Sequence, residues 1–428
     1  MSYTNLPLNP TVVVIGAGAA GLSAARELSR QRISFVLVEA ANRVGGRAYT
    51  ESSSFMQPVD HGCSWITGSD NNFFKEFGIM QGFTLVDHTN ASADIFEKDG
   101  SRSSPSSIKR YNIAEKAIEK TINDAGMAGQ DIPASQVISH IHFGGIYQNW
   151  EGALNFAVDM EDISTLDYYK ARSSQPSHIV KEGLGALVSK LYENFPIKLS
   201  TKVTEINLSG EQVEVTTTAG KIKAEYCICT VSIGVLQAEK IKFTPALPLQ
   251  KQEAINDLKM GLLIKIPLLF DGNRLGLGEN NRVEYDLAPE DIGSGCYFLA
   301  WPTGHDYLMG FIGGNFGWDL YAHGQDAVVE YAIEKLIFML GSNTRRHLVR
   351  GFASDWADNP LTLGSYSAAK PGHGNARENL CELESGKLLF AGEAIETEIY
   401  GLVNGAFESG KKAAVAIGKL INSKRNLL

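Results

Sequence analysis

The stretch TVVVIGAGAAG, residues 11–21, decides the fold. Its β-branched apolar run ends in a glycine-rich turn, and the helical pattern LSAARELSR follows at 22–30. A second apolar run, ISFVLVEA, covers 33–40. Two short apolar runs separated by a turn and a helical pattern are typical of strand, helix and strand. The segment therefore predicts a βαβ unit.

The turn itself has the spacing G-x-G-x-x-G, formed by Gly16, Gly18 and Gly21. In a dinucleotide site the first glycine permits the tight turn, the second lets the backbone approach a pyrophosphate, and the third lets helix and strand pack closely. The helix N-terminus, which includes Ala20, offers N–H donors to the phosphates. Glu39 follows Gly21 by eighteen residues, where a carboxylate can accept bonds from a ribose hydroxyl. This context favours a dinucleotide site over a turn without a ligand.

Length and charge restrict the class of protein. A chain of 428 residues is too long for one ordinary core, so two or three domains are expected. The net charge of −9 argues against nucleic acid as a partner and weakly favours cationic substrates. The start MSYTNLPLNP does not resemble a signal peptide, and no apolar run reaches membrane-spanning length. We expect a cytoplasmic protein without a membrane partner, and a homodimer remains open.

The five cysteines at positions 63, 227, 229, 296 and 381 are odd in number and scattered. Cys227 and Cys229 form C-x-C without a second pair of ligands. This pattern predicts buried thiols in a reducing compartment rather than disulfides or a metal site.

Beyond the βαβ unit the chain alternates in character. Residues 85–175 show helical patterns and an aromatic stretch, and short alternating strands cover 197–232. Further helices are expected near 327–340 and 405–421. The alternation predicts two domains built from interleaved segments.

Two further motifs carry a resemblance to a known family. RVGGR lies at 43–47, directly after the βαβ unit, and LLFAGEA lies at 388–394. Together with the first glycine motif they resemble the flavin-containing amine oxidase superfamily, in the branch of monoamine oxidases, polyamine oxidases and lysine-specific histone demethylases. The resemblance implies an α/β fold: a Rossmann-like FAD-binding domain of the glutathione reductase type with an interleaved α+β substrate-binding domain.

The resemblance also implies the domain boundaries. The FAD-binding domain is expected to combine residues 1–80, 175–255 and 355–428, and the substrate-binding domain residues 81–174 and 256–354.

Several cofactor contacts follow from the same resemblance. Gly46 and Arg47 would contact the pyrophosphate and the flavin side, and Glu393 the ribityl chain or a phosphate. The backbone of Val203 would hold the adenine. Val403 belongs to the C-terminal flavin motif GEAIETEIYGLVNGAFESG at 392–410.

One lysine in the apolar stretch MGLLIKIPLLF, residues 260–270, allows two interpretations. From the pattern alone, Lys265 and Pro267 would blunt an exposed edge strand. The resemblance instead implies that Lys265 holds a water against flavin N5. It also implies that Trp356 and Tyr366, in WADNPLTLGSYSAA at 356–369, lie beside the flavin as the other catalytic residues.

The departures from the family pattern concern the cofactor link and the substrate. Ser365 stands where covalent members carry a cysteine, so non-covalent FAD is expected. Leu402 replaces the second tyrosine of the aromatic cage that Tyr366 begins, and Thr67 replaces a frequent polyamine anchor. With Thr67, Tyr366 and Leu402 as substrate-binding residues, we expect a bulkier or secondary amine to react better than spermine or benzylamine.

The implied reaction is oxidation of an amine to an imine by hydride transfer to flavin N5. Dioxygen would reoxidise the flavin to give hydrogen peroxide, and the imine would hydrolyse to an aldehyde or ketone. Two alternatives stay open: an FAD-dependent desaturase or dehydrogenase acting on a non-amine, and an FAD-stabilised binding protein without turnover.

Overall fold

The structure is a computed structural model that describes residues 7, 9–68, 72–171, 176–193 and 195–425. Most of the N-terminal stretch MSYTNLPLNP, on which the signal-peptide prediction rests, lies outside these residues.

A five-stranded parallel sheet organises the nucleotide-binding half, with the strand order β22-β13-β1-β2-β9. The central strand β1 (Val12–Ile15) pairs with β13 (Tyr226–Cys229) and β2 (Phe35–Val38), and the outer strands are β22 (Leu388–Phe390) and β9 (Ile197–Lys198). The three central strands are buried throughout, as parallel strands covered on both faces require. The predicted βαβ unit is therefore confirmed.

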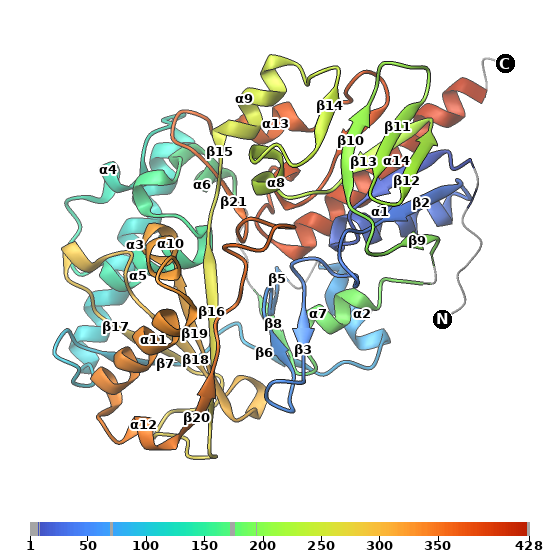
Figure 1. Ribbon diagram of the computed structural model, residues 1–428. Coiled ribbons are helices and arrows are strands. Elements are labelled where there is room, and N and C mark those ends of the chain that lie inside the picture. The colour runs from blue at the N-terminus through green and yellow to red at the C-terminus, as the bar shows by residue number, and fades with distance from the viewer. Residues whose placement is uncertain (1–6, 8, 69–71, 172–175, 194, 426–428) are drawn as a thin grey trace.

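Different elements cover the two faces of this sheet. Helices α1 (Ala19–Arg30) and α14 (Val403–Arg425) pack against each other and share one core with Val12 and Val14 (Figure 1). Val13 and Ile15 point to the opposite face, into the core formed with the four-stranded sheet. That sheet has the order β12-β11-β10-β14. Its strands are β12 (Gly220–Ala224), β11 (Val213–Thr217), β10 (Val203–Asn207) and β14 (Lys242–Thr244).

The alternating runs at 197–208 and 221–232 each divide between the two sheets. The first run supplies β9 to the parallel sheet and β10 to the four-stranded sheet, and the second supplies β12 and β13 in the same way. The sequence pattern predicted strands in both runs, but periodicity does not reveal a change of sheet within a run.

A six-stranded sheet organises the other half, with the order β20-β16-β19-β18-β17-β7. Its strands are β20 (Leu348–Gly351), β16 (Leu263–Phe270), β19 (Tyr307–Gly313), β18 (Tyr297–Ala300), β17 (Arg282–Tyr285) and β7 (Ala93–Phe96). Helices α3 (Pro105–Met127), α10 (Gly314–Tyr321) and α11 (Gln325–Leu340) lie in this half (Figure 1). The helices expected near 327–340 and 405–421 are thus present, the second as part of α14.

Small sheets connect the halves. Two of them join segments assigned to different domains. One is the three-stranded sheet of β5 (Trp65–Thr67), β8 (Ser177–Val180) and β6 (Leu85–Asp87), and the other is the pair of β15 (Leu258–Met260) and β21 (Ser367–Ala369). A further pair is formed by β3 (Thr50–Glu51) and β4 (Val59–Asp60). Strands thus pair across the predicted domain boundaries near residues 80 and 256. These boundaries stay a prediction.

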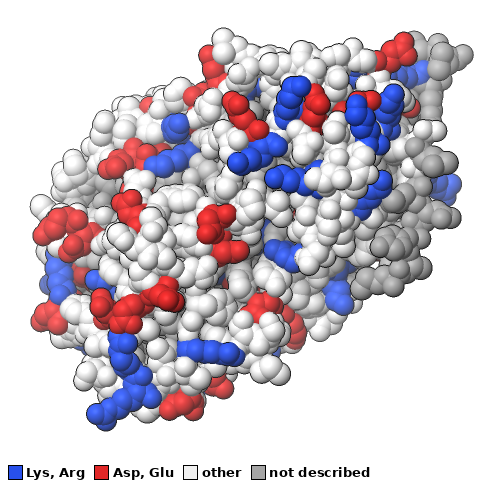
Figure 2. All heavy atoms as spheres, viewed as in Figure 1, with Lys and Arg blue, Asp and Glu red and all other residues white. Residues whose placement is uncertain are grey.

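The remaining helices are short and connect these sheets. They are α2 (Phe73–Met80), α4 (Ala134–Ile138), α5 (Gly145–Asn149), α6 (Thr165–Lys170), α7 (Leu184–Ser189), α8 (Ile233–Gln237), α9 (Leu249–Asp257), α12 (Thr344–His347) and α13 (Ala376–Leu380), with a π-helix η2 (Trp150–Phe156) and short turns η3 (Met160–Asp162), η4 (Pro289–Asp291), η5 (Pro302–Gly304) and η6 (Glu393–Ile395). On the face drawn in Figure 2, lysine and arginine side chains lie interspersed with aspartate and glutamate.

Candidate active site

A large cavity lies between the parallel sheet and the six-stranded sheet. Its volume is about 1410 Å³, and its lining includes residues of β1 and β2 as well as of β16, β18 and β19. A pocket for one drug-sized ligand holds roughly 300–1,000 Å³. The cavity therefore has room for a dinucleotide cofactor together with a substrate.

Two glycine-rich loops meet at one end of this cavity. Gly18 and Gly45 form an isolated parallel bridge, and the Gly45 N–H donates to the Ala17 carbonyl at 2.8 Å. A Cβ on Gly46 would lie 3.2 Å from the Gly18 Cα. Helix α1 begins directly after Gly18, so its first N–H groups face the space between the loops. Bare backbone and a helix N-terminus are what a pyrophosphate needs, so these residues fit FAD.

The third glycine of the motif has a structural role. A Cβ on Gly21 would lie 1.8 Å from the Gly16 carbonyl oxygen, which leaves no room for any side chain between α1 and the end of β1. Gly16, Gly18 and Ala20 line the cavity.

Glu39 lies at the end of β2 and is fixed by the backbone. Its carboxylate accepts N–H bonds from Ala17 at 2.6 Å and Ala41 at 2.8 Å, and the residue is 8% exposed. Burial raises the pKa of Glu39. Val203, on β10, lines the cavity with Glu39. The structure thus brings together the residues predicted for the ribose and the adenine.

Arg47 and Glu393 form an ion pair on the wall of the cavity. The Arg47 guanidinium lies 3.0 Å from the Glu393 carboxylate and also donates to the Ser365 carbonyl at 2.5 Å. The other Glu393 oxygen accepts from the Ser367 hydroxyl at 2.9 Å. Two residues far apart in the sequence are therefore held in one arrangement at the predicted flavin side.

This pair continues into a buried network that sequence reasoning missed. Arg377, only 2% exposed, donates to Ser367, lies 3.3 Å from the Asp167 carboxylate, and places its guanidinium 3.8 Å from the centroid of the Tyr400 ring. Tyr400 lines the cavity and donates to the Asp167 carbonyl at 2.7 Å. A lone arginine in the segment GNARENL gave no signal of burial, since most arginines are exposed.

Lys265 is buried, and the edge-strand interpretation is wrong. Strand β16 lies between β19 and β20, and Lys265 is 3% exposed. Its Nζ donates to the Ser64 hydroxyl and, at 3.3 Å, to the Asp60 carbonyl. Burial lowers the pKa of Lys265 to about 8. A buried ammonium that lines the cavity and titrates near neutrality is an unusual feature of functional interest.

The aromatic residues predicted beside the flavin also lie at the cavity. Trp356 lines it and donates its indole N–H to the His61 carbonyl at 2.8 Å. Trp65 also lines the cavity, with the centroid of its ring 5.7 Å from the Lys265 ammonium. His61 lines the cavity as well, and its Nε2 lies 3.7 Å from a Glu51 oxygen.

Tyr366 and Leu402 face the cavity close to each other. The Tyr366 hydroxyl donates to the Leu154 carbonyl, and a Cβ on Gly401 would lie 3.6 Å from the Tyr366 ring. Leu402 and Val403 follow Gly401 and line the cavity, as does Thr67. All predicted substrate-binding residues therefore line the same cavity, while their roles stay predictions.

The half of the cavity away from the glycine loops is acidic. Helix α3 contributes the exposed residues Glu115 and Glu119, and Glu151 of η2 and Glu284 of β17 lie deeper. Sequence reasoning missed all four. The available signal was the helical spacing of Asn112, Glu115, Glu119 and Asn123, which places these side chains on one face of α3. That face lines the cavity.

The residues of the predicted aromatic stretch, which had no assigned role, lie in two different environments. Trp150, Phe156 and Tyr168 line the cavity, whereas Tyr169 is 45% exposed. The cysteines are free thiols, buried at 227, 229 and 296, but Cys381 is exposed, contrary to the expectation of buried thiols.

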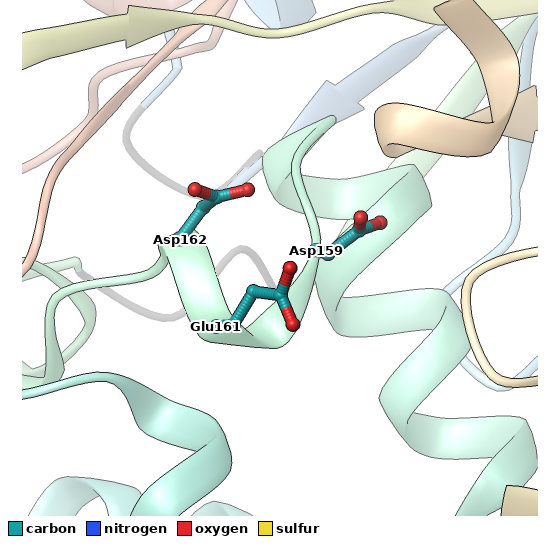
Figure 3. A group of neighbouring side chains, drawn as sticks. All are labelled: Asp159, Glu161 and Asp162. Carbon is teal, nitrogen blue, oxygen red and sulfur yellow. The ribbon is translucent and has the colours of Figure 1, made fainter. Parts of the chain in front are cut away.

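One acidic cluster lies outside the cavity lining. Figure 3 shows Asp159, Glu161 and Asp162 on and just before η3, with one oxygen of each within 4.8 Å of the others. Asp162 pairs with Lys259 at 2.5 Å, and Asp159 lies against Gly314, where helix α10 begins. An aspartate at a helix N-terminus and an ion pair account for Asp159 and Asp162 without a ligand, and Glu161 is exposed.

No helix of the described residues has the length and apolar character to cross a lipid bilayer.

Comparisons with known proteins agree with this geometry. The family described as flavin containing amine oxidoreductase matches residues 150–418, and a NAD(P)-binding Rossmann-like domain matches residues 14–77. Polyamine oxidase 5 of Oryza sativa subsp. japonica is 31% identical, over 95% of this chain and 87% of its own length. Lysine-specific histone demethylase 2 of Homo sapiens is 27% identical, over 96% of this chain and 53% of its own length.

A solved structure of putrescine oxidase bound to putrescine superposes with a TM-score of 0.78. It is 17% identical and covers 96% of this chain and 99% of its own, so the likeness concerns the fold. The predicted Rossmann-like domain with an interleaved α+β domain is confirmed.

Proposed function

The chain belongs to the flavin-containing amine oxidoreductases and is a flavin-dependent amine oxidase, and we propose that its substrate is an extended amine with more than one cationic group. The observation that carries the proposal is the excess of carboxylates at the end of the cavity away from the glycine loops, where Glu115, Glu119, Glu151 and Glu284 lie with Arg282. Relatives that include polyamine oxidases support the same class of substrate.

The end at the glycine loops suits the cofactor. Bare backbone and the N-terminus of α1 lie where an anionic pyrophosphate would bind, and Arg43 and Arg47 offset the charges of Glu39 and Glu393. At the acidic end the carboxylates of Glu115, Glu119 and Glu151 attract ammonium groups instead. We therefore expect a polyamine to be a good substrate although Thr67 is not an acidic anchor, in contrast to the expectation from the sequence.

Flavin, when bound, supplies the redox chemistry by accepting a hydride from the carbon next to the amine nitrogen, so that the amine becomes an imine. The chain binds and orients the reactants. Lys265 extends from β16 at the cavity wall, and below its pKa of about 8 it adds positive potential there. Trp356 and Tyr366 are fixed by hydrogen bonds to backbone carbonyls, so their rings exclude water at defined positions.

The test is anaerobic titration of the holoprotein with spermine and with octylamine, followed by admission of dioxygen. Bleaching of the flavin absorbance by spermine at lower concentration than by octylamine, and hydrogen peroxide formation on admission of dioxygen, are the expected results. Bleaching by no amine would contradict the proposal. Bleaching that dioxygen does not reverse would favour the dehydrogenase alternative.

The FAD should be held without a covalent bond. The Ser365 hydroxyl donates to the Leu263 carbonyl and accepts from the Leu263 N–H, each at 2.9 Å, so this position joins two backbone segments and offers no thiol. Acid or heat denaturation should release intact FAD into the supernatant, where its absorbance and mass identify it. Yellow flavin that stays with the precipitated chain would overturn this prediction.

A cytoplasmic location is also proposed, since all five cysteines are free and reduced thiols persist in that compartment. The homodimer stays a prediction.

A further inference from the structure

We propose that Glu151 binds the ammonium group at the far end of the substrate and thereby determines which amines are oxidised efficiently. The inference rests on the proposed function and adds to it a residue that sets specificity. Three observations carry it: the position of Glu151 on a π-helix, its hydrogen bonds, and its lack of a cationic partner.

Glu151 lies in the π-helix η2 (Trp150–Phe156), which forms part of the cavity wall. Single π-turns within helices are rare and occur frequently at functional sites. Leu154 lies in the last turn of η2, where carbonyls have no partner within the helix, and its carbonyl accepts the hydrogen bond from Tyr366. The π-helix therefore connects Glu151 rigidly to the aromatic ring predicted to lie where the amine is oxidised.

Hydrogen bonds hold the Glu151 carboxyl group in place. One oxygen accepts from the hydroxyls of Tyr147 and Tyr168, each at 3.3 Å, and the other accepts from the Asn155 amide at 2.6 Å. The two tyrosine hydroxyls also lie 2.9 Å from each other. A carboxyl group fixed by three neutral donors is pre-organised to receive a cation at the cavity side.

The charge on Glu151 is not compensated within the protein. No lysine or arginine of the described residues forms an ion pair with Glu151, and Glu119 lies near enough to repel a negative charge there. Burial raises the pKa of Glu151. Burial raises the pKa of Glu284 as well, but the Arg282 guanidinium lies 3.3 Å from its carboxylate and the Trp150 indole donates to it at 2.7 Å.

This contrast assigns the two carboxylates different roles. Glu284 already has a cation within ion-pair distance, whereas the half-buried Glu151 has none among the described residues. An ammonium group of the substrate would supply that charge and gain charge-assisted hydrogen bonds in return. Because Glu151 is fixed relative to Tyr366, the distance between two nitrogens of the substrate becomes a criterion for productive binding.

The test uses Glu151→Gln and two amines of equal chain length, diaminooctane and octylamine. Glutamine keeps an oxygen that can accept from the tyrosines but removes the charge. KM for diaminooctane should rise about ten- to a hundredfold, as for loss of one partner of a buried charge pair, while KM for octylamine changes less than about threefold. Glu151→Asp, which keeps the charge, should restore part of the difference.

A matched control is Glu161→Gln, which removes the same charge from an exposed position outside the cavity lining and should leave both KM values unchanged. Equal changes for both amines in Glu151→Gln, or no change in either, would refute the role of Glu151 while wild-type oxidation of diaminooctane still supports the proposed function. Failure of the wild type to oxidise any amine would instead refute the proposed function.

Discussion

Replacing Lys265 by methionine is expected to slow turnover by a factor of about one hundred or more without loss of the fold or of bound FAD. Lys265 lines the cavity, is 3% exposed, and donates to Ser64 and Asp60 from strand β16. Methionine has a similar length and suits an apolar strand, so the change removes the charge and the donor while it keeps the packing. The measurement is stopped-flow kinetics of the two half-reactions, one with amine and one with dioxygen.

The pH dependence provides a second readout for the same residue. A pKa of about 8 means that Lys265 is positive below that pH and neutral above it. Any half-reaction that needs the positive charge should slow as the pH rises through 8, and the methionine variant should lack that inflection.

Stability should change in the opposite sense. The unfolded chain keeps its lysine protonated up to about pH 10.5, so between pH 8 and 10.5 it binds more protons than the native state. The free energy of unfolding of wild-type apoprotein should therefore rise relative to Lys265→Met across this range, by about 3 kcal/mol.

Lys259→Met is the matched control. Lys259 lies on β15, outside the cavity lining, and pairs with Asp162. Both half-reactions should stay within about twofold of the wild type in this variant. If Lys265→Met also leaves both rates unchanged, Lys265 does not act in the reaction.

The βαβ unit and the glycine motif were predictable because their signals are local. Valine-rich strands, a helical pattern and glycines at fixed spacing lie within about thirty residues, and each glycine has a distinct geometric reason. The carboxylate of Glu39 was also predictable, since it follows directly from the end of β2.

Lys265 shows why the rest was not predictable from pattern alone. The stretch 260–270 allowed both a protected edge and a buried strand, and the difference depends on β19 and β20, which lie tens of residues further along the chain. Only the family resemblance favoured the buried position. Glu151 had no comparable signal, because the segment YQNWEGALNF reads as an ordinary helix and nothing in it indicates a π-turn.

The second large effect is expected at the glycine motif, where two substitutions separate cofactor binding from folding. Gly18→Ala should leave the stability of the apoprotein within about 0.5 kcal/mol of the wild type. The added Cβ would meet its nearest neighbours at 3.9 Å, and the φ of −75° suits alanine. The methyl group would, however, occupy the space between the two glycine loops that a pyrophosphate needs.

FAD binding by Gly18→Ala should therefore weaken roughly a hundredfold, as for loss of one or two hydrogen bonds to a charged group. Gly21→Ala should differ, because its Cβ would lie 1.8 Å from the Gly16 carbonyl oxygen and helix α1 would have to move away from β1. Overpacking of this kind costs about 1–3 kcal/mol, and the loss should appear in the apoprotein before any cofactor is added. Urea unfolding of the apoproteins and titration with FAD, followed by quenching of flavin fluorescence, measure the two effects separately. If Gly18→Ala binds FAD with wild-type affinity, the pyrophosphate does not bind between these loops. If both apoproteins are equally destabilised, the second glycine, like the third, serves packing alone.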